Sequence, residues 1–119
     1  MRLITSQLGY GMTNLKLSGR MDIEGADELN LKLNVATSED GALLIVDLSE
    51  VVFMSTIGIS VLVRVANAAR RRGGNLVLLS PQPVVRLVLV ETHIHEVITI
   101  CDTLDEAMSA VREVPRKSA

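Results

Sequence analysis

Short apolar segments of strand length alternate with longer segments of helical periodicity along this chain. Residues 42–48 are almost entirely apolar, as are residues 76–79. Apolar runs this short are typical of strands buried on both faces, as in a sheet that helices cover. Between them, Ile59, Leu62, Ala66 and Ala69 follow helical spacing. Strands that alternate with helices predict an α/β fold whose sheet contains parallel pairs.

The remaining elements complete this pattern. The first strands are expected at 3–8 and 12–17 around a Gly9-Tyr10-Gly11 turn, with residues 19–22 ending the second. A helix over 24–37 would be capped by Asp22, and Thr103 with Glu106 forms a capping box for the last helix, which Pro115 stops. In the first half of the chain, strands 3–8 and 12–17 are followed by helix 24–37 and strand 42–48, from which residues 49–54 lead onward. In the second half, a helix from 55 or 56 to 72, stopped by Gly73-Gly74, precedes strand 75–79. Helix 82–91 follows Ser80-Pro81, and strand 96–100 and a helix from 103 complete the order. This β-β-α-β-α-β-α-β-α order predicts one domain with a mixed, mostly parallel sheet and four helices.

Composition excludes several classes of function. Hydrophobic residues make up 48% of the 119 residues but aromatic residues only 2%, so the core is aliphatic and a base-stacking surface for single-stranded nucleic acid is disfavoured. The net charge of −2 offers no electrostatic footprint for nucleic acid. The longest charge-free stretch, 51–63, is shorter than the ~18 residues a membrane span needs, and the N-terminus has no signal-peptide pattern. We therefore expect a cytoplasmic protein that does not insert into a membrane.

Three motifs were weighed as chemical sites. His93 and His95 could bind a metal with Glu91 or Glu96, but a polar loop is favoured. Gly73-Gly74 follows a helix and lacks the Lys-Ser or Lys-Thr of a phosphate-binding loop, so it is interpreted as a helix stop. Cys101, the only cysteine, is interpreted as a small core residue and permits no intrachain disulfide. We expect no cofactor, no metal and no catalytic residues.

Ser55 and Thr56 place two adjacent hydroxyls at the start of a helix. One hydroxyl can cap that helix. A phosphate on such a hydroxyl would also be tolerated, because free amides and the helix dipole favour negative charge there. Phosphorylation would add about −1.5 to −2 charges and disrupt a partner surface laid over that point.

Four motifs in order resemble one family. Residues 47–59, Asp-Leu-Ser followed by Phe53 and then Ser55-Thr56-Ile57-Gly58, resemble the signature of STAS domains, the bacterial anti-sigma factor antagonists. Residues 19–22 resemble the turn after the family's second strand. Residues 73–78, and 97–103 with Glu106-Ala107, resemble its later strands and last helix cap. The resemblance spans nearly the whole chain, with the domain expected at 1–114 and a tail at 115–119.

The resemblance implies particular site residues. Thr56 matches the family's phosphoacceptor, which is more often Ser, and Ser55 is the secondary candidate. Ser55 also matches a position that is often Asp. The implied partner surface comprises Asp22, Ser55, Thr56, Ile57, Gly58 and Arg64.

The resemblance also implies a partner-switching function in transcription regulation. The unphosphorylated protein would bind an anti-sigma factor that is itself a serine/threonine kinase and so release a sigma factor. Phosphorylation of Thr56 would break that complex, and a serine/threonine phosphatase would restore it. Two alternatives stay open: an accessory subunit of a lipid ABC transport system, and a scaffold of a multi-protein sensory complex. No enzymatic activity is expected, and a homodimer is left open.

Overall fold

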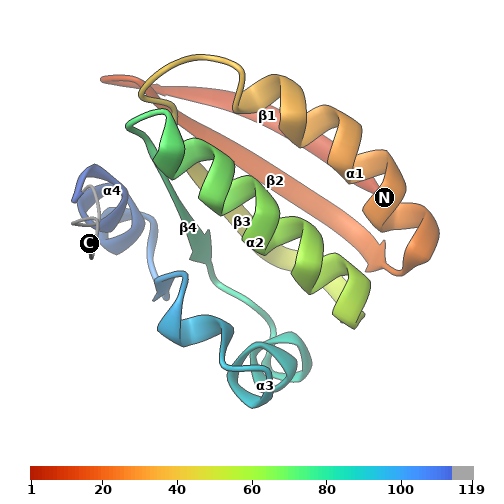
Figure 1. Ribbon diagram of the computed structural model, residues 1–119. Helices are drawn as coiled ribbons and strands as arrows, with labels where there is room; N and C mark the ends of the chain where they lie inside the picture. The colour runs from red at the N-terminus through yellow and green to blue at the C-terminus, as the bar shows by residue number, and fades with distance from the viewer. Residues whose placement is uncertain (114–119) are drawn as a thin grey trace.

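The computed structural model describes residues 1–113 as a five-stranded sheet with four α-helices (Figure 1). This α/β architecture and the alternation of strands and helices confirm the expected fold class. In chain order the elements are β1 Arg2–Gly9, β2 Met12–Met21, α1 Ile23–Ala36, β3 Leu43–Met54, α2 Thr56–Arg71, β4 Asn75–Leu79, α3 Pro83–Glu91, the 3-10 helix η1 Ile94–Glu96, β5 Ile100–Cys101 and α4 Leu104–Arg112.

The strands follow one another across the sheet in the order β1-β2-β3-β4-β5. β1 and β2 pair antiparallel, and every later neighbour is parallel. The expected hairpin turn is present, with positive φ at Tyr10 (53°) and Gly11 (78°). Two consecutive residues in this conformation match the twist of the strands they join.

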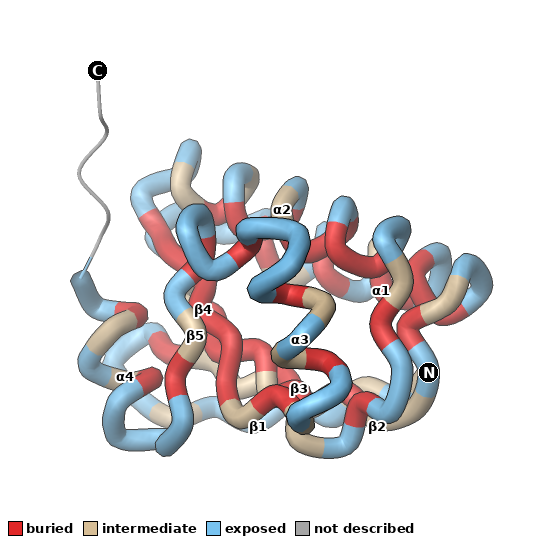
Figure 2. The backbone as a smooth tube through the Cα atoms, turned by 90° about the horizontal axis from the view of Figure 1, so that it is seen from below, coloured by how far each residue is buried: buried red, intermediate tan, exposed pale blue. Residues whose placement is uncertain are grey.

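The two faces of the sheet are covered unequally. Side chains alternate along β3, so Leu44, Val46 and Leu48 join the larger core while Ile45 joins a smaller one. The larger core lies under α1, α2 and α3, and the smaller core lies under α4. Figure 2 shows the buried residues concentrated on the strands and on the inner sides of the helices.

The third strand is longer than the sequence predicted. It was expected over 42–48, but β3 continues to Met54, and β2 likewise continues to Met21 instead of ending after residue 17. The register between them shifts twice: Lys16 pairs with Asp47 but Ser18 with Glu50, and Gly19 with Val51 but Arg20 with Phe53. Each shift inserts an extra residue in β3, a bulge that removes the period-two signature of a strand.

The last strand is shorter and lies later than predicted: it was expected over 96–100 and is found at Ile100–Cys101. Residues 94–96 form η1, and only Ile100 and Cys101 pair with β4. Ile94 and Ile98 are both buried, and the Ile98 amide donates to the Ile94 carbonyl at 2.8 Å. Glu96 between these isoleucines is exposed, whereas a strand would place residues 94, 96 and 98 on one face, so the burial pattern indicates a helical turn.

Several predicted ends are confirmed. The Gly73 φ of 79° follows the end of α2, and the Thr103 hydroxyl accepts from the Glu106 amide at 3.2 Å. Helix α3 begins at Pro83 with Gln82 as its cap position and ends at Glu91, within one residue of the predicted span 82–91. Pro115 and the expected tail 115–119 lie outside the described residues.

Candidate functional site

Two helix caps lie side by side at the carboxyl ends of β2 and β3. Met21 and Met54 end these parallel strands in register, so Asp22 and Ser55 follow at the same edge of the sheet. The Asp22 Oδ1 accepts from the Gly25 amide at 3.0 Å and caps α1. The Ser55 Oγ accepts from the Gly58 amide at 3.2 Å and caps α2. The structure therefore brings together the two loops that the sequence singled out.

The hydroxyls of Ser55 and Thr56 have different roles. The half-buried Ser55 Oγ also donates to the Met21 carbonyl at 2.7 Å, and the Ser55 amide donates to the same carbonyl at 3.0 Å. Thr56 is exposed, and within residues 1–113 its hydroxyl makes no hydrogen bond. Ser55 is thus committed to holding the helix start against β2, while the Thr56 hydroxyl is accessible.

Gly58 contributes to the site through packing. It is buried, and a Cβ at this position would lie 2.0 Å from the Met21 Cγ and 3.0 Å from the Met54 Sδ. Only a residue without a side chain lets the first turn of α2 approach the strand ends this closely. Gly58 is thus buried beneath the exposed Thr56 and Ile57, and its place in a partner surface stays a prediction.

The electrostatics differ between the two helix starts. The hydrogen bond from the Gly25 amide, helped by the nearby Arg20 guanidinium, lowers the pKa of Asp22. Asp22 thus stays ionised at the start of α1. The first turn of α2 contains no acidic residue. Its positive dipole end has no compensating side-chain charge, so it favours an added anion.

Exposed apolar side chains occur on the two segments that meet at the ends of β2 and β3. Ile57, which follows Thr56, is 42% exposed, and Phe53 is 38% exposed. Ile23, just after the Asp22 cap, is 61% exposed. The Arg20 guanidinium lies 4.4 Å from the centroid of the Phe53 ring, a cation–π contact. The sequence reasoning missed Arg20 and Ile23, although an isoleucine directly after a helix cap was a visible signal.

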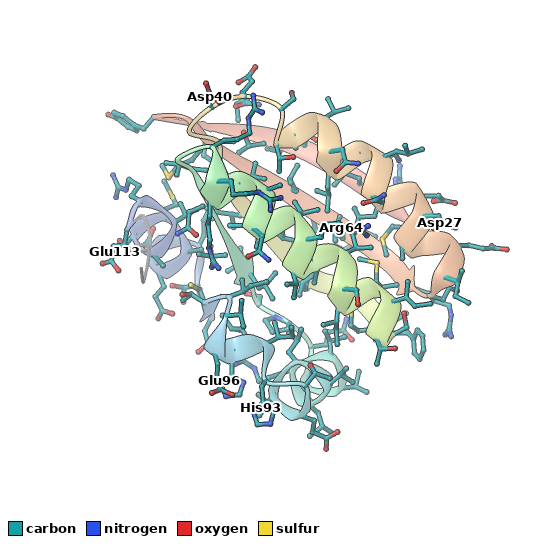
Figure 3. All side chains as sticks on the ribbon, viewed as in Figure 1. Asp27, Asp40, Arg64, His93, Glu96 and Glu113 are labelled. Carbon is teal, nitrogen blue, oxygen red and sulfur yellow. The ribbon has the colours of Figure 1, made fainter. Side chains whose placement is uncertain are left out.

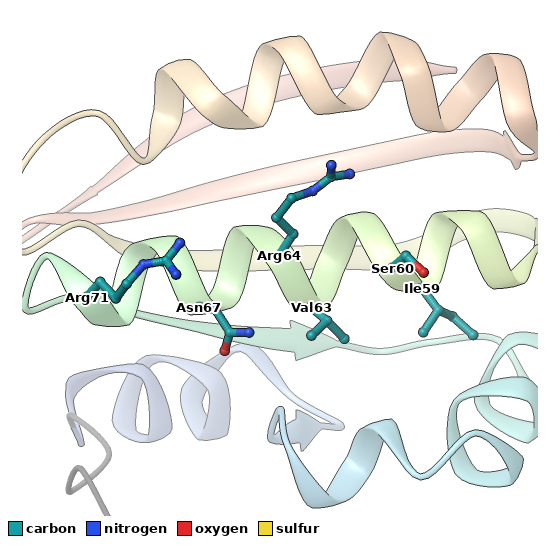
Figure 4. Close-up of a pocket in the computed structure, with 6 residues that line it drawn as sticks. All are labelled: Ile59, Ser60, Val63, Arg64, Asn67 and Arg71. Carbon is teal, nitrogen blue, oxygen red and sulfur yellow. The ribbon is translucent and has the colours of Figure 1, made fainter.

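Arg64 stands apart from the caps on the same helix. It is eight residues beyond Thr56, which is about 12 Å along the axis of α2. It lines a shallow groove with Ile59, Ser60, Val63, Asn67 and Arg71 (Figure 4). Its side chain points towards α1, whereas Val63 and Asn67 point to the opposite side of α2. Arg64 therefore extends the exposed face of α2 but does not contact Thr56.

The other sequence motifs do not form a site with the caps. The His93 Nδ1 lies 2.6 Å from the Glu96 Oε2, and its ring stacks on His95 at 6.1 Å (Figure 3). Among the described residues, no three His, Cys, Asp or Glu side chains are placed to share a metal ion. Cys101 is buried, and burial raises the pKa of its thiol. Of the helices in residues 1–113, none has both the length and the apolar character needed to cross a membrane.

Comparison with known proteins identifies the family. The model of the STAS domain matches residues 6–107, which include both caps, strands β2 to β5 and the second half of β1. The chain belongs to the STAS domain family. This confirms the resemblance seen in the sequence.

Solved STAS structures share the fold. An anti-sigma factor antagonist from Mycobacterium paratuberculosis has a TM-score of 0.83 at 21% identity, with 94% of each chain covered. The Bacillus cell fate determinant SpoIIAA in its phosphorylated form has a TM-score of 0.70 at 19% identity, covering 93% of this chain and 100% of that one. A sulfate transporter family protein from Wolinella succinogenes has a TM-score of 0.74 at 18% identity, covering 92% and 91%.

Proposed function

We propose that this STAS protein is an anti-sigma factor antagonist that switches partners through phosphorylation of Thr56. In its unphosphorylated form it binds an anti-sigma factor that is a serine/threonine kinase, and a sigma factor is released. Phosphorylation by that kinase separates the two proteins, and a serine/threonine phosphatase reverses the change. The protein acts by binding and catalyses no reaction of its own.

The observation that supports this proposal is that two neighbouring hydroxyls have different structural roles. Ser55 makes two hydrogen bonds that hold the start of α2, so its modification would disturb the fold. Thr56 is exposed and its hydroxyl makes no hydrogen bond within the described residues. A phosphate on Thr56 would lie at the uncompensated positive end of α2, where the helix tolerates it.

The surroundings of Thr56 explain how a phosphate would release a partner. The exposed side chains of Ile23, Phe53 and Ile57 offer an apolar contact area on the two segments that meet at the ends of β2 and β3. A partner that covers this area would have to bury the phosphate and its two negative charges against apolar atoms, which is strongly unfavourable.

Phosphosite mapping tests the proposal directly. The protein isolated from its native host should carry one phosphate on Thr56, detected by intact mass and peptide fragmentation. Thr56→Ala should abolish it, and Thr99→Ala, which alters another exposed threonine, should retain it. A phosphate that survives Thr56→Ala, or none under any growth condition, contradicts the proposal.

Binding to the phosphorylating kinase tests the switch itself. Thr56→Glu should raise the Kd for that kinase by at least about tenfold, or about 1.4 kcal/mol. Thr56→Val keeps the size of the side chain and removes the hydroxyl, so it should bind almost as tightly as the parent. Equal affinities for the Glu and Val variants would argue against electrostatic release.

The fold similarity to a sulfate transporter family protein favours a second candidate, a role beside a transport complex. If this second hypothesis holds, the chain should co-purify with transporter subunits instead of with a kinase. A lipid ABC system is one such complex, and a sensory scaffold would instead give assemblies of high mass.

A further inference from the structure

The outer edge of β1 is a long, unprotected sheet edge. β1 is the first strand in the sheet order, so one side of it pairs with β2, and within residues 1–113 no strand pairs with its other side. It is eight residues long, and six of them are exposed. Its only charged residue is Arg2 at its first position; it contains no Pro, Lys, Asp or Glu, and its one irregularity lies at the Gly9 end. Monomeric proteins usually protect an edge with such residues, with bulges or with covering segments.

The other free strand edges are short or partly covered. β5, at the opposite side of the sheet, has only two residues and contacts α4. β3 extends beyond its pairing with β4, and there the Gln82 side chain donates to the Ser49 carbonyl at 2.8 Å. β1 is therefore the edge at which another strand can add.

Helix α1 presents apolar side chains beside this edge. Leu31 and Val35, one turn apart, are 72% and 73% exposed. Val35, with Lys32 and Glu39, lines a cleft between α1 and the side chains of Leu3, Thr5 and Gln7 on β1. On the opposite face of β1, Ile4 is 48% exposed. Apolar side chains thus flank the free edge on both faces of the sheet.

The charges in the cleft are self-complementary under two-fold symmetry. α1 runs in the same direction as β1, because each is antiparallel to β2, so Lys32 and Glu39 lie towards opposite ends of the cleft. Within residues 1–113 neither forms an ion pair. A two-fold axis through the middle of β1 would place Lys32 of one copy opposite Glu39 of the other.

Symmetry also restricts the register. A two-fold axis perpendicular to the sheet leaves the same face of both copies on the same side of the joined sheet. Residues opposite one another across the axis must then point to the same face, so the axis passes through one residue that pairs with its own copy. Centring on Thr5 sets Leu3 opposite Gln7 and Ile4 opposite Ser6, and it pairs two threonines, a favourable cross-strand combination.

We propose that the free edge of β1, with Lys32 and Val35 of α1 and Glu39 just after that helix, is the interface of a symmetric homodimer. The two β1 strands pair antiparallel about Thr5 and join two sheets into one. The face that carries Thr56 lies at the ends of β2 and β3 and at the start of α2, so this interface is separate from the proposed switch.

Charge reversal tests the interface. By light scattering after size exclusion, the full chain should have twice its mass of 12.9 kDa. Lys32→Glu and Glu39→Lys should each raise the dimer Kd by at least about tenfold, because like charges then face one another across the axis. The double variant Lys32→Glu/Glu39→Lys should restore the dimer. Glu91→Lys, an equal charge change on exposed α3, should leave the parent Kd unchanged.

A cysteine at the two-fold axis tests the register. In a dimer centred on Thr5, the Cβ atoms of residue 5 in the two copies are about 5 Å apart. The thiols of Thr5→Cys are then close enough to form an intermolecular disulfide under mild oxidation. Tyr10→Cys, at the 89% exposed hairpin tip, should cross-link far more slowly. The proposal is overturned by a monomer at every concentration tested, by single charge reversals that leave the dimer intact, or by equal cross-linking of the two cysteine variants.

Discussion

At the scale of the residue, the sequence could locate the site but could not show which of its two hydroxyls caps the helix and which is exposed. Ser55 and Thr56 were both visible at the start of a helix, and either could have been its cap. The choice depends on the Met21 carbonyl, which lies 34 residues earlier in the chain and accepts a hydrogen bond from the Ser55 hydroxyl. Only the pairing of β2 with β3 brings that carbonyl to Ser55, so local sequence could not show it.

This difference predicts unequal stability effects for two adjacent substitutions. Ser55→Ala removes the cap of α2 and a bond to Met21, and it should lower the free energy of unfolding by about 0.5–2 kcal/mol. Thr56→Ala removes an exposed hydroxyl that makes no hydrogen bond within residues 1–113, and it should change the free energy of unfolding by less than about 0.5 kcal/mol. Urea unfolding of both variants beside the parent measures the contrast. Equal losses would mean that the roles of the two hydroxyls are not divided as described.

At the scale of the element, prediction succeeded where the periodicity was regular. β4 and the two major helices matched closely because their apolar spacing was uninterrupted. It failed for the second half of β3, where two bulges remove the alternation, and for 96–98, where β-branched residues continue a helical turn instead of a strand. The first failure matters for function, because the bulged half of β3 carries Phe53 and leads directly into Ser55.

Because α2 approaches the ends of β2 and β3 closely, we predict that position 58 does not tolerate a side chain. Gly58→Ala adds a Cβ that overlaps the Met21 side chain, and it should cost about 1–3 kcal/mol despite the higher helix propensity of alanine. Asn67→Ala, an exposed change in the same helix, provides the control and should be nearly neutral. Because Met21 can be shortened, Gly58→Ala/Met21→Ala should lose less stability than the sum of the single variants. Strict additivity would show that the two residues do not meet.

At the scale of the whole molecule, the sheet separates two cores of different size. Three helices close one face, whereas α4 covers part of the other, and Asn75 ties α4 to β4 by donating to the carbonyls of Val111 and Glu113 at 3.3 and 3.2 Å. The rest of that face carries polar side chains, including the Lys16–Glu50 ion pair at 3.0 Å. This asymmetry keeps the Thr56 face, with its helix caps, on the more extensively packed side of the molecule.

Adjacent residues of β3 allow the two cores to be disturbed separately. Ile45 and Val46 are both 0% exposed, but Ile45 faces α4 and Val46 faces α1 and α2. Ile45→Ala should cost about 2–5 kcal/mol. Measured by amide hydrogen exchange, it should speed exchange most in α4 and β5, because a small cluster with few contacts opens first. Val46→Ala should instead accelerate exchange across α1, α2 and the central strands together. The two-core description would be contradicted if both variants gave the same pattern of protection loss.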